Sequence, residues 1–228
     1  MLPASPPDEA SSAQSASVSL ILLRHGWTRW NHEGRYNSRT DLPLTHEGVL
    51  SAAGAGQALR CRTINHVVSS PLARARLTAE IVSRKVGLPT EDVVLMSDLR
   101  EVDFGQFEGL SRSEIEQSDL KEDYWAWRNA DSTSPSAPGG ESWESAMRRA
   151  DRLLQHFSEG SGCTLVVSHG YTLRMIITRA LGIPYGPAIR RLRLDNTSFS
   201  ELELMDYGWR VSRHNFAATL ADEEKAAM

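Results

Sequence analysis

The chain has 228 residues, of which 40% are hydrophobic and 24% are charged, and its formal net charge is −4 at pH 7. This length is sufficient for one α/β domain with a substantial core, and the negative balance argues against a nucleic-acid surface, which requires a dense basic face. The sequence contains no apolar run of the roughly 20 residues that a membrane span requires.

The first residues and the cysteines indicate the extent of the folded part and its compartment. Residues 1–16 are rich in proline, serine and alanine, so burial cannot offset the entropy cost of ordering them. We expect a disordered tail there, one domain over residues 17–216 and a C-terminal tail over 217–228. Cys61 and Cys163 lack the spacing of a disulfide framework or zinc site, and a basic, apolar leader is missing, which favours the reducing cytoplasm.

Strands and helices are predicted to alternate along the first part of the chain. The apolar run Val18–Leu23 is typical of a strand that is buried on both faces of a parallel sheet. Thr45 is a candidate N-cap of the first helix, whereas Pro71 and Gly87 are expected in the first turn and after the last turn of the second. The expected elements are a strand over 18–23, a helix over 45–59, a strand over 66–70, a helix over 71–87 and a strand over 92–96.

The middle of the chain, from about residue 105 to 140, has irregular periodicity and reads as an insertion or lid. Its stretch "DYWAW" places Tyr124, Trp125 and Trp127 close together. These rings are interpreted either as a hydrophobic anchor for the lid or as a surface that contacts substrate.

The βα rhythm resumes after the insertion. An amphipathic helix is predicted over 141–157, a buried strand over 163–168, a helix over 171–182 and added edge strands within 188–215. The predicted fold class is therefore α/β, a three-layer αβα sandwich with a mostly parallel central sheet.

Two apolar strands, "LILLRHG" and "TLVVSHG", end on His-Gly, which places His25 and His169 at strand ends. Ligands of open α/β sheets gather beyond the carboxyl ends of the strands, and glycine permits a tight turn with backbone close to a ligand. The two histidines, with Gly170 behind the second, therefore predict one pocket.

Arginines give this pocket its expected ligand. Arg24 precedes His25, and Arg74 lies about one helical turn beyond the strand over 66–70. Each guanidinium can grip two oxygens in a planar fork, and helix N-termini add backbone donors, so the site suits a phosphoryl group.

A departing alcohol needs a proton donor, and "DLREVDFGQFEG" supplies carboxylates just after the third strand. Glu101 is closest to the strand end and is our choice. Asp103 and Glu108, further along the loop, remain competing candidates.

These blocks together resemble the histidine phosphatase superfamily, also called phosphoglycerate mutase-like. "RHGWTRWN" is similar to its Arg-His-Gly-x-Thr-x-x-Asn signature, and "SSPLARA", "LREVDFGQFEG" and "VVSHG" are similar to three further blocks in the same order. The resemblance implies these roles: His25 as nucleophile, Arg24, Arg74 and His169 as phosphate ligands, Asn31 in the pocket and Glu101 as proton donor.

The sequence departs from the family pattern near the expected substrate. Trp27 stands at a signature position that is often polar, and Asn37 and Ser38 stand where many relatives carry Gln-Gly. We expect Trp27, Asn37 and Gly170 to help bind substrate, with the aromatic face of Trp27 against its apolar part.

The expected function is hydrolysis of a small phosphorylated metabolite through a phosphohistidine, without a metal or other cofactor. The first alternative is a phosphoglycerate mutase, but the insertion "SRSEIEQSDLKEDYW" is short, acidic and poor in cations for a substrate carboxylate. The second alternative is an inactive phosphate-binding interaction module, which the intact set of reactive residues argues against. We expect no nucleic-acid or membrane partner and consider a homodimer as an assembly.

Overall fold

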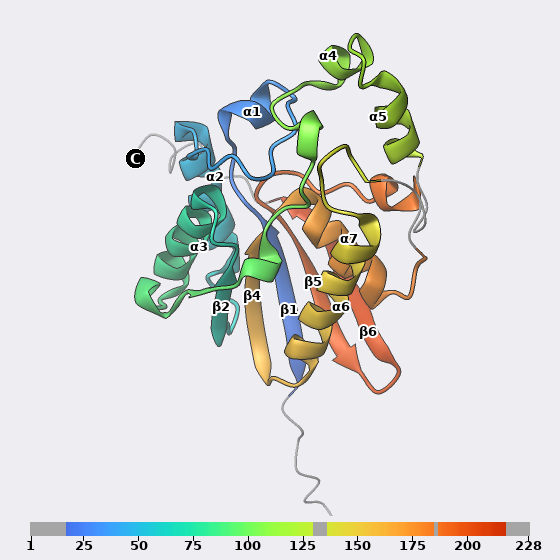
Figure 1. Cartoon of the computed structure of the whole chain (residues 1–228). Helices are drawn as coiled ribbons and strands as arrows, with labels where there is room; N and C mark the ends of the chain where they lie inside the picture. The colour runs from blue at the N-terminus through green and yellow to red at the C-terminus, as the bar shows by residue number, and fades with distance from the viewer. Residues whose placement is uncertain (1–16, 130–135, 185–186, 218–228) are drawn as a thin grey trace, which may run out of the picture.

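The computed structural model describes residues 17–129, 136–184 and 187–217. Its elements form three layers, with a six-stranded sheet between two layers of helices (Figure 1). This arrangement confirms the predicted αβα architecture. The predicted N-terminal tail lies outside the described residues, and so does the C-terminal tail apart from Ala217, which ends the last strand.

The sheet has the strand order β3-β2-β4-β1-β5-β6. β1 is parallel to β4, β4 to β2 and β2 to β3, whereas β5 runs antiparallel to β1 and β6 antiparallel to β5. The mostly parallel sheet with added edge strands is thus confirmed. The strands are β1 Val18–Arg24, β2 His66–Ser69, β3 Val94–Leu95, β4 Gly162–Ser168, β5 Ser198–Met205 and β6 Gly208–Ala217.

Seven α-helices connect and cover these strands among the described residues. They are α1 Arg29–His32, α2 His46–Leu59, α3 Ala73–Val86, α4 Arg112–Glu116, α5 Lys121–Arg128, α6 Trp143–Ser158 and α7 Gly170–Ala180. Short 3₁₀ turns lie at Thr90–Asp92, Ser97–Leu99, Gly105–Phe107 and Pro187–Arg191.

Burial on both faces of β1 holds the layers together. Leu20 and Leu22 pack into the core under α6 and α7, and Ile21 and Leu23 pack into the core under α2 and α3. This alternation follows from the two-residue period of a strand, and burial on both sides explains why the sequence is apolar throughout.

The helix ends agree with the sequence in most places. The Thr45 hydroxyl accepts from the Gly48 N–H at the start of α2, and Gly87 ends α3 with a left-handed φ of 81°. The prediction of Pro71 in the first turn of α3 is wrong: Leu72 is the N-cap, so Pro71 precedes the helix.

Two predicted strands are shorter than expected. The strand expected over 92–96 is only Val94–Leu95, because Thr90–Asp92 form a 3₁₀ turn and the edge strand pairs with β2 alone. The edge strands expected within 188–215 begin only at Ser198, because 187–191 form a further 3₁₀ turn.

The insertion carries α4 and α5 above the carboxyl end of the sheet (Figure 1). Tyr124 and Trp127 are buried in the large core, and the Trp127 ring stacks on Trp143 with centroids 5.2 Å apart. Burial favours the interpretation of these two residues as a hydrophobic anchor. Residues 130–135 of the stretch expected to be flexible lie outside the described part.

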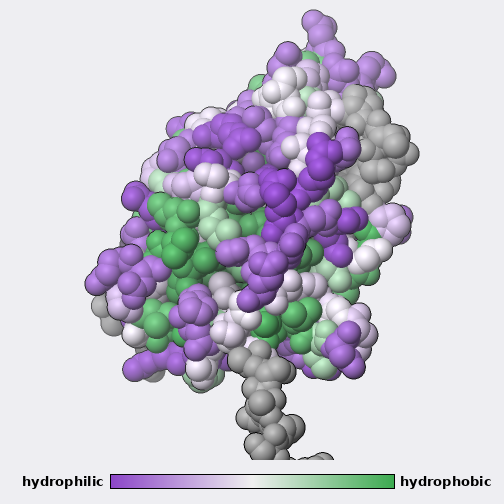
Figure 2. All heavy atoms as spheres, turned by 60° about the horizontal axis from the view of Figure 1, so that its bottom comes forward, coloured by the Kyte–Doolittle hydropathy of each residue, from purple (hydrophilic) through white to green (hydrophobic). Residues whose placement is uncertain are grey.

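The opposite end of the molecule carries exposed apolar side chains. Figure 2 brings this end forward and shows apolar side chains gathered between polar ones. Val94 and Leu95 of the edge strand are among the exposed large hydrophobic residues.

Within the described ranges, none of the helices is both long enough and apolar enough to span a bilayer.

Candidate active site

Parallel pairing brings the two predicted histidines together. Arg24 at the end of β1 lies opposite Ser168 at the end of β4, so His25 and His169 leave the sheet side by side. The His25 N–H donates to the Ser168 carbonyl at 3.0 Å, and the two rings lie 5.0 Å apart between centroids. Both side chains are buried.

The His25 ring is oriented by its own backbone. Its Nδ1 lies 2.7 Å from the Gly26 carbonyl oxygen. Because a carbonyl can only accept, Nδ1 carries the proton in this contact and the lone pair remains on Nε2. The amide of Asn196 donates to the carbonyls of both His25 and Gly26, at 3.0 and 3.3 Å, and so fixes the turn.

His169 is held by a neighbouring strand. Its Nε2 lies 2.8 Å from the hydroxyl oxygen of Ser70, which follows β2. His169 is also the N-cap residue of α7, so Gly170 opens that helix beside the site. Its Nδ1 is buried and has no hydrogen-bond partner among the described residues.

Two buried arginines flank the histidines. Arg24 donates from Nη1 to the Leu194 carbonyl at 2.6 Å. Arg74, on α3, is fully buried and donates to the carbonyls of Thr40 and Ser38. The Nε atoms of both arginines are buried without a hydrogen-bond partner in the described part of the chain, which suits them to an anion.

Burial and these cations keep both imidazoles neutral. The pKa of His25 lies well below its usual range, first because of burial and then because of Arg74 and Arg24. The pKa of His169 is lowered by burial and by Arg74. Burial also lowers the pKa of Arg24 and of Arg74 to about 10, so both remain charged at pH 7. A neutral imidazole beside two cations can act as a nucleophile toward phosphorus.

The three candidate carboxylates lie in different places. Glu101 is buried, lines the pocket at the histidines and accepts from the N–H groups of Tyr171 and Thr172 at the start of α7. Asp103 accepts from Arg39 at 3.1 Å, and Glu108 accepts from Ser38 and Thr40.

This separation assigns different tasks to the carboxylates. Of the three, only Glu101 is among the residues that line the pocket. Glu108 instead fixes the loop whose carbonyls hold Arg74, a supporting contact that the sequence did not indicate. Glu101 is therefore the carboxylate placed to exchange a proton with a bound ligand.

The pocket has a volume of about 170 Å³. It contains most of the predicted residues, but Arg74, His169 and Trp27 are not among the lining residues. The lining residues are Arg24, His25, Asn31, Arg35, Tyr36, Asn37, Glu101, Phe104, Gly170, Tyr171 and Arg174.

Trp27 is used elsewhere in the structure. Its ring stacks on His32 with centroids 4.8 Å apart, and its carbonyl accepts from the Thr45 N–H at 2.9 Å. The structure therefore does not bring Trp27 into the pocket, because these contacts hold it against α1 and the start of α2.

The sequence did not indicate several lining residues. Tyr36, Phe104 and Tyr171 form an aromatic wall in which the Phe104 ring lies 5.1 Å from Tyr36 and 5.3 Å from Tyr171, between centroids. Arg174 lies one turn into α7. The only feature of the sequence that could have indicated its place in the pocket is its spacing of five residues from His169.

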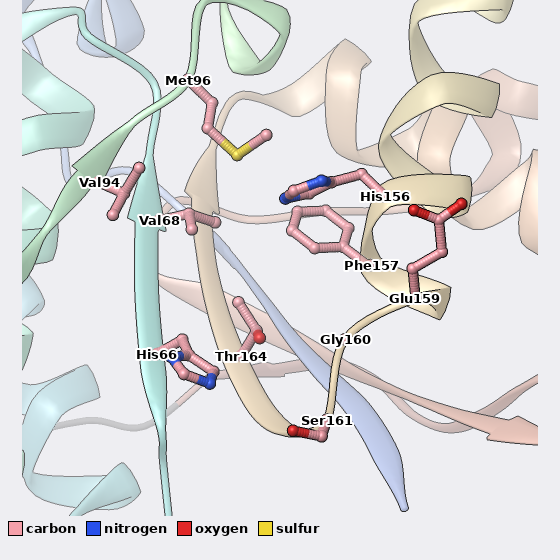
Figure 3. Close-up of a pocket in the computed structure, with 10 residues that line it drawn as sticks. All are labelled: His66, Val68, Val94, Met96, His156, Phe157, Glu159, Gly160, Ser161 and Thr164. Atoms are coloured by element: carbon pink, nitrogen blue, oxygen red, sulfur yellow. The ribbon is translucent and has the colours of Figure 1, made fainter.

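A larger cavity, of about 570 Å³, lies away from the histidine pair (Figure 3). It is lined by apolar side chains from β2, β3 and α6 and also by His66, His156 and Glu159. It contains no arginine or lysine, so it lacks the cations that a phosphate requires.

Across the described ranges, no three His, Cys, Asp or Glu side chains gather as a metal site would need.

Comparisons with known proteins agree with this geometry. A family model, Histidine phosphatase superfamily (branch 1), matches residues 20–217. The chain is 35% identical over 199 residues to a protein named probable phosphoglycerate mutase GpmB from Salmonella choleraesuis, covering 86% of this chain and 89% of that protein.

Solved structures of phosphatases have the same fold. A putative alpha-ribazole-5'-P phosphatase from Escherichia coli superposes with a TM-score of 0.78 at 29% identity, over 90% of this chain and all of that one. A mycobacterial glucosyl-3-phosphoglycerate phosphatase superposes with a TM-score of 0.77 at 27% identity, over 88% of this chain and 100% of that one.

Proposed function

Because the chain belongs to branch 1 of the histidine phosphatase superfamily, we propose that it hydrolyses a small phosphorylated metabolite through a phosphohistidine on His25. The observation that carries this proposal is the His25 ring: its Nδ1 is occupied by the Gly26 carbonyl, and its pKa is lowered by burial and by the neighbouring Arg74 and Arg24. A neutral ring with a free Nε2 is the form that attacks phosphorus.

The proposed reaction has two steps. His25 Nε2 forms a bond to phosphorus while the ester P–O bond breaks, and Glu101 donates a proton to the departing oxygen. Water, activated by the Glu101 carboxylate, then attacks the phosphohistidine and releases inorganic phosphate together with the neutral imidazole. Arg24, Arg74 and His169 would bind the phosphoryl oxygens. Hydrogen-bond donors that are already fixed in place would then stabilise the negative charge of the transition state.

The reaction as proposed needs no metal or organic cofactor, because two arginines supply the positive charge. A small phosphorylated metabolite as substrate is consistent with the pocket volume of about 170 Å³. The cytoplasmic location and the homodimer remain predictions from the sequence.

The test is phosphate release from 4-nitrophenyl phosphate by the wild type and by His25→Ala. We expect His25→Ala to lose more than a thousandfold in kcat/KM, because the remaining groups can bind but cannot form the intermediate. The quenched wild-type enzyme should carry an acid-labile, alkali-stable phosphate. Activity of His25→Ala within tenfold of wild type would contradict the proposal.

A phosphoglycerate mutase is the second candidate, since the curated relative at 35% identity bears that name. Within the insertion, Arg112 pairs with Glu116 and Arg128 donates to the hydroxyls of Tyr36 and Tyr124. Arg112 is thus paired with a carboxylate and less available to a second anionic group of a substrate, which favours hydrolysis. Product analysis with 3-phosphoglycerate distinguishes the two: free phosphate supports the hydrolase, and 2-phosphoglycerate without free phosphate supports the mutase.

A further inference from the structure

We propose that a buried ion pair, Arg149 with Glu141, positions Glu101 for proton transfer to the leaving group. Neither partner is among the residues that line the pocket, so the pair acts through the acid loop, which we define as residues 98–103. The inference rests on the proposed phosphatase function, and it adds to that function a positioning pair outside the pocket.

Arg149 lies on α6 and is buried. A charged side chain is seldom buried unless it is paired, and here the partner is Glu141, which precedes the helix. The Nε and Nη2 atoms of Arg149 donate to the two carboxylate oxygens of Glu141, at 3.2 and 2.8 Å. The two side chains therefore form a bidentate pair.

Stability alone does not account for such a pair. The cost of removing two charges from water can exceed their mutual attraction, and apolar residues of similar volume often replace a buried pair without loss of stability. The remaining part of the Arg149 guanidinium shows another use. Its Nη1 donates to the backbone carbonyls of Asp98 and, at 2.8 Å, of Arg100.

The acid loop is fixed at three consecutive carbonyls before Glu101. Arg149 donates to the first and the third, those of Asp98 and Arg100. The carbonyl between them accepts from the Ser168 hydroxyl at 2.7 Å. Side chains from α6 and from the end of β4 therefore hold the three peptide units that lead into Glu101.

Glu141 fixes the acid loop on the other side of Glu101. Its backbone N–H donates to the Asp103 carbonyl at 3.0 Å. The two segments approach closely, because a Cβ atom built on the neighbouring Gly140 would lie 2.5 Å from the same carbonyl oxygen. The ion pair thus connects the two ends of the acid loop, with Glu101 between them.

The acid loop presents the Glu101 carboxylate to the start of α7. One carboxylate oxygen accepts from the Thr172 N–H at 3.0 Å, and the other accepts from the Tyr171 N–H at 3.1 Å. Both N–H groups lie in the first turn of α7, where a helix offers no backbone acceptor. Because a misplacement of about 1 Å can cost roughly a hundredfold in rate, proton transfer depends on how firmly the acid loop is held.

The test compares two phosphate esters of similar size that differ in their need for a proton donor. Nitrophenolate leaves from 4-nitrophenyl phosphate without a proton, whereas the alkoxide of benzyl phosphate is a poor leaving group and needs one. Arg149→Met should lower kcat/KM for benzyl phosphate by about ten- to a hundredfold and keep 4-nitrophenyl phosphate within about threefold. A wild type that cleaves 4-nitrophenyl phosphate but not benzyl phosphate would contradict the inference.

Arg152→Gln is the matched control. Arg152 lies on the same helix and contacts the same residue of the acid loop, but it binds the side-chain carboxylate of Asp98 instead of backbone carbonyls. The control should keep the wild-type kcat/KM on both esters. An equal loss on both esters in Arg149→Met, or the same selective loss in Arg152→Gln, would overturn the inference.

A double substitution keeps the test decisive if Arg149→Met does not fold. Removing one partner leaves the other charge buried and is strongly destabilising, whereas removing both charges often costs little. Glu141→Gln/Arg149→Met should therefore fold and still show the selective loss on benzyl phosphate, because the carbonyls of the acid loop lose their donor. Wild-type kcat/KM for both esters in the folded double variant would refute the positioning role.

A second combination shows whether Arg149 acts through Glu101. Glu101→Gln removes the transferable proton, so it should show the selective loss on benzyl phosphate by itself. Adding Arg149→Met to Glu101→Gln should then lower kcat/KM for benzyl phosphate by less than about threefold, because residues that act as a unit have non-additive effects. A further loss of about tenfold or more would show that Arg149 acts independently of Glu101.

Amide hydrogen exchange separates this inference from the proposed function. The N–H groups of Tyr171 and Thr172 donate to Glu101, so in Arg149→Met they should exchange about tenfold faster relative to the other amides of α7, and in Arg152→Gln they should not. If the wild type releases no phosphate but exchange changes in this way, the hydrolase proposal fails and the positioning of Glu101 stands. If phosphate is released but exchange and ester preference stay unchanged, only the positioning pair fails.

Discussion

At the scale of single residues, burial together with the neighbouring arginines sets the charge of the two histidines. An exposed imidazole has a pKa of about 6.5, whereas burial beside Arg24 and Arg74 keeps His25 and His169 neutral well below that value. The same environment makes protonation of these two histidines unfavourable in the folded protein. The neutral imidazole that the proposed mechanism requires and the dependence of stability on pH therefore have one cause.

This cause predicts how stability depends on pH. Below pH 6.5 the unfolded chain binds protons at His25 and His169 that the folded protein does not bind, so the free energy of unfolding falls as the pH falls. Each histidine contributes a slope of about 1.4 kcal/mol per pH unit between the unfolded and folded pKa values, and none above pH 6.5.

Urea unfolding at pH 7.5, 6.5 and 5.5 measures this slope. His25→Gln removes one titrating group and should reduce the slope below pH 6.5 by about 1.4 kcal/mol per unit. His46→Gln, which replaces an exposed histidine on α2, is the control and should keep the wild-type slope. A slope that is unchanged in His25→Gln would show that its pKa is not lowered by folding.

At the scale of elements, α7 and the insertion are connected through aromatic rings. Trp127 of α5 lies 5.7 Å from Tyr36, 5.9 Å from Phe104 and 5.7 Å from Tyr171, all between centroids, and these three rings form the pocket wall. The insertion thus supports the wall from behind, because its rings belong to the same core.

Trp127→Ala should therefore destabilise the whole protein. Removing a fully buried tryptophan costs about 3–5 kcal/mol of the free energy of unfolding, because a large cavity remains. The urea midpoint measures this loss. Trp125→Ala, which changes a partly buried ring of the same helix, should cost less than half as much. Equal effects of the two substitutions would contradict the assignment of Trp127 to the core.

At the scale of the whole molecule, the site gathers residues from most of the chain. Arg24 and His25 follow β1, Arg74 belongs to α3, His169 precedes α7, and Asn196 reaches back from the segment before β5. An anion that contacts these groups links the layers of the fold. Its binding energy should therefore appear as stability of the entire domain.

Orthovanadate, which mimics the five-coordinate phosphorus of the transition state, should raise the melting temperature. At 100 times its Kd, binding adds about 2.7 kcal/mol, which corresponds to roughly 5–10 °C for a domain of this size. The melting temperature of Arg74→Met should be the same with and without vanadate. Arg76→Met, on the exposed side of α3, should retain the rise. Equal shifts in both variants would place the anion elsewhere.

The sequence alone determined the layers and the place of the histidine pair. Apolar strands that are buried on both sides must lie in the middle of a sandwich, and parallel strands place their carboxyl ends at one edge. The His-Gly ends after Leu23 and Val167, together with Arg74 and Glu101, therefore point to one site through sequence pattern alone. The roles of these residues stay predictions that the experiments above test.

Only the tertiary structure decided which side chains complete the pocket. Arg174, Tyr36 and Tyr171 carry no motif, and their place depends on how α7 and the insertion pack against the sheet. Trp27, whose position beside His25 suggests a substrate contact, instead stacks on His32. Local patterns specify strands and caps because their interactions lie within a few residues, whereas the pocket wall results from contacts between residues more than 60 positions apart, such as Tyr36 with Phe104.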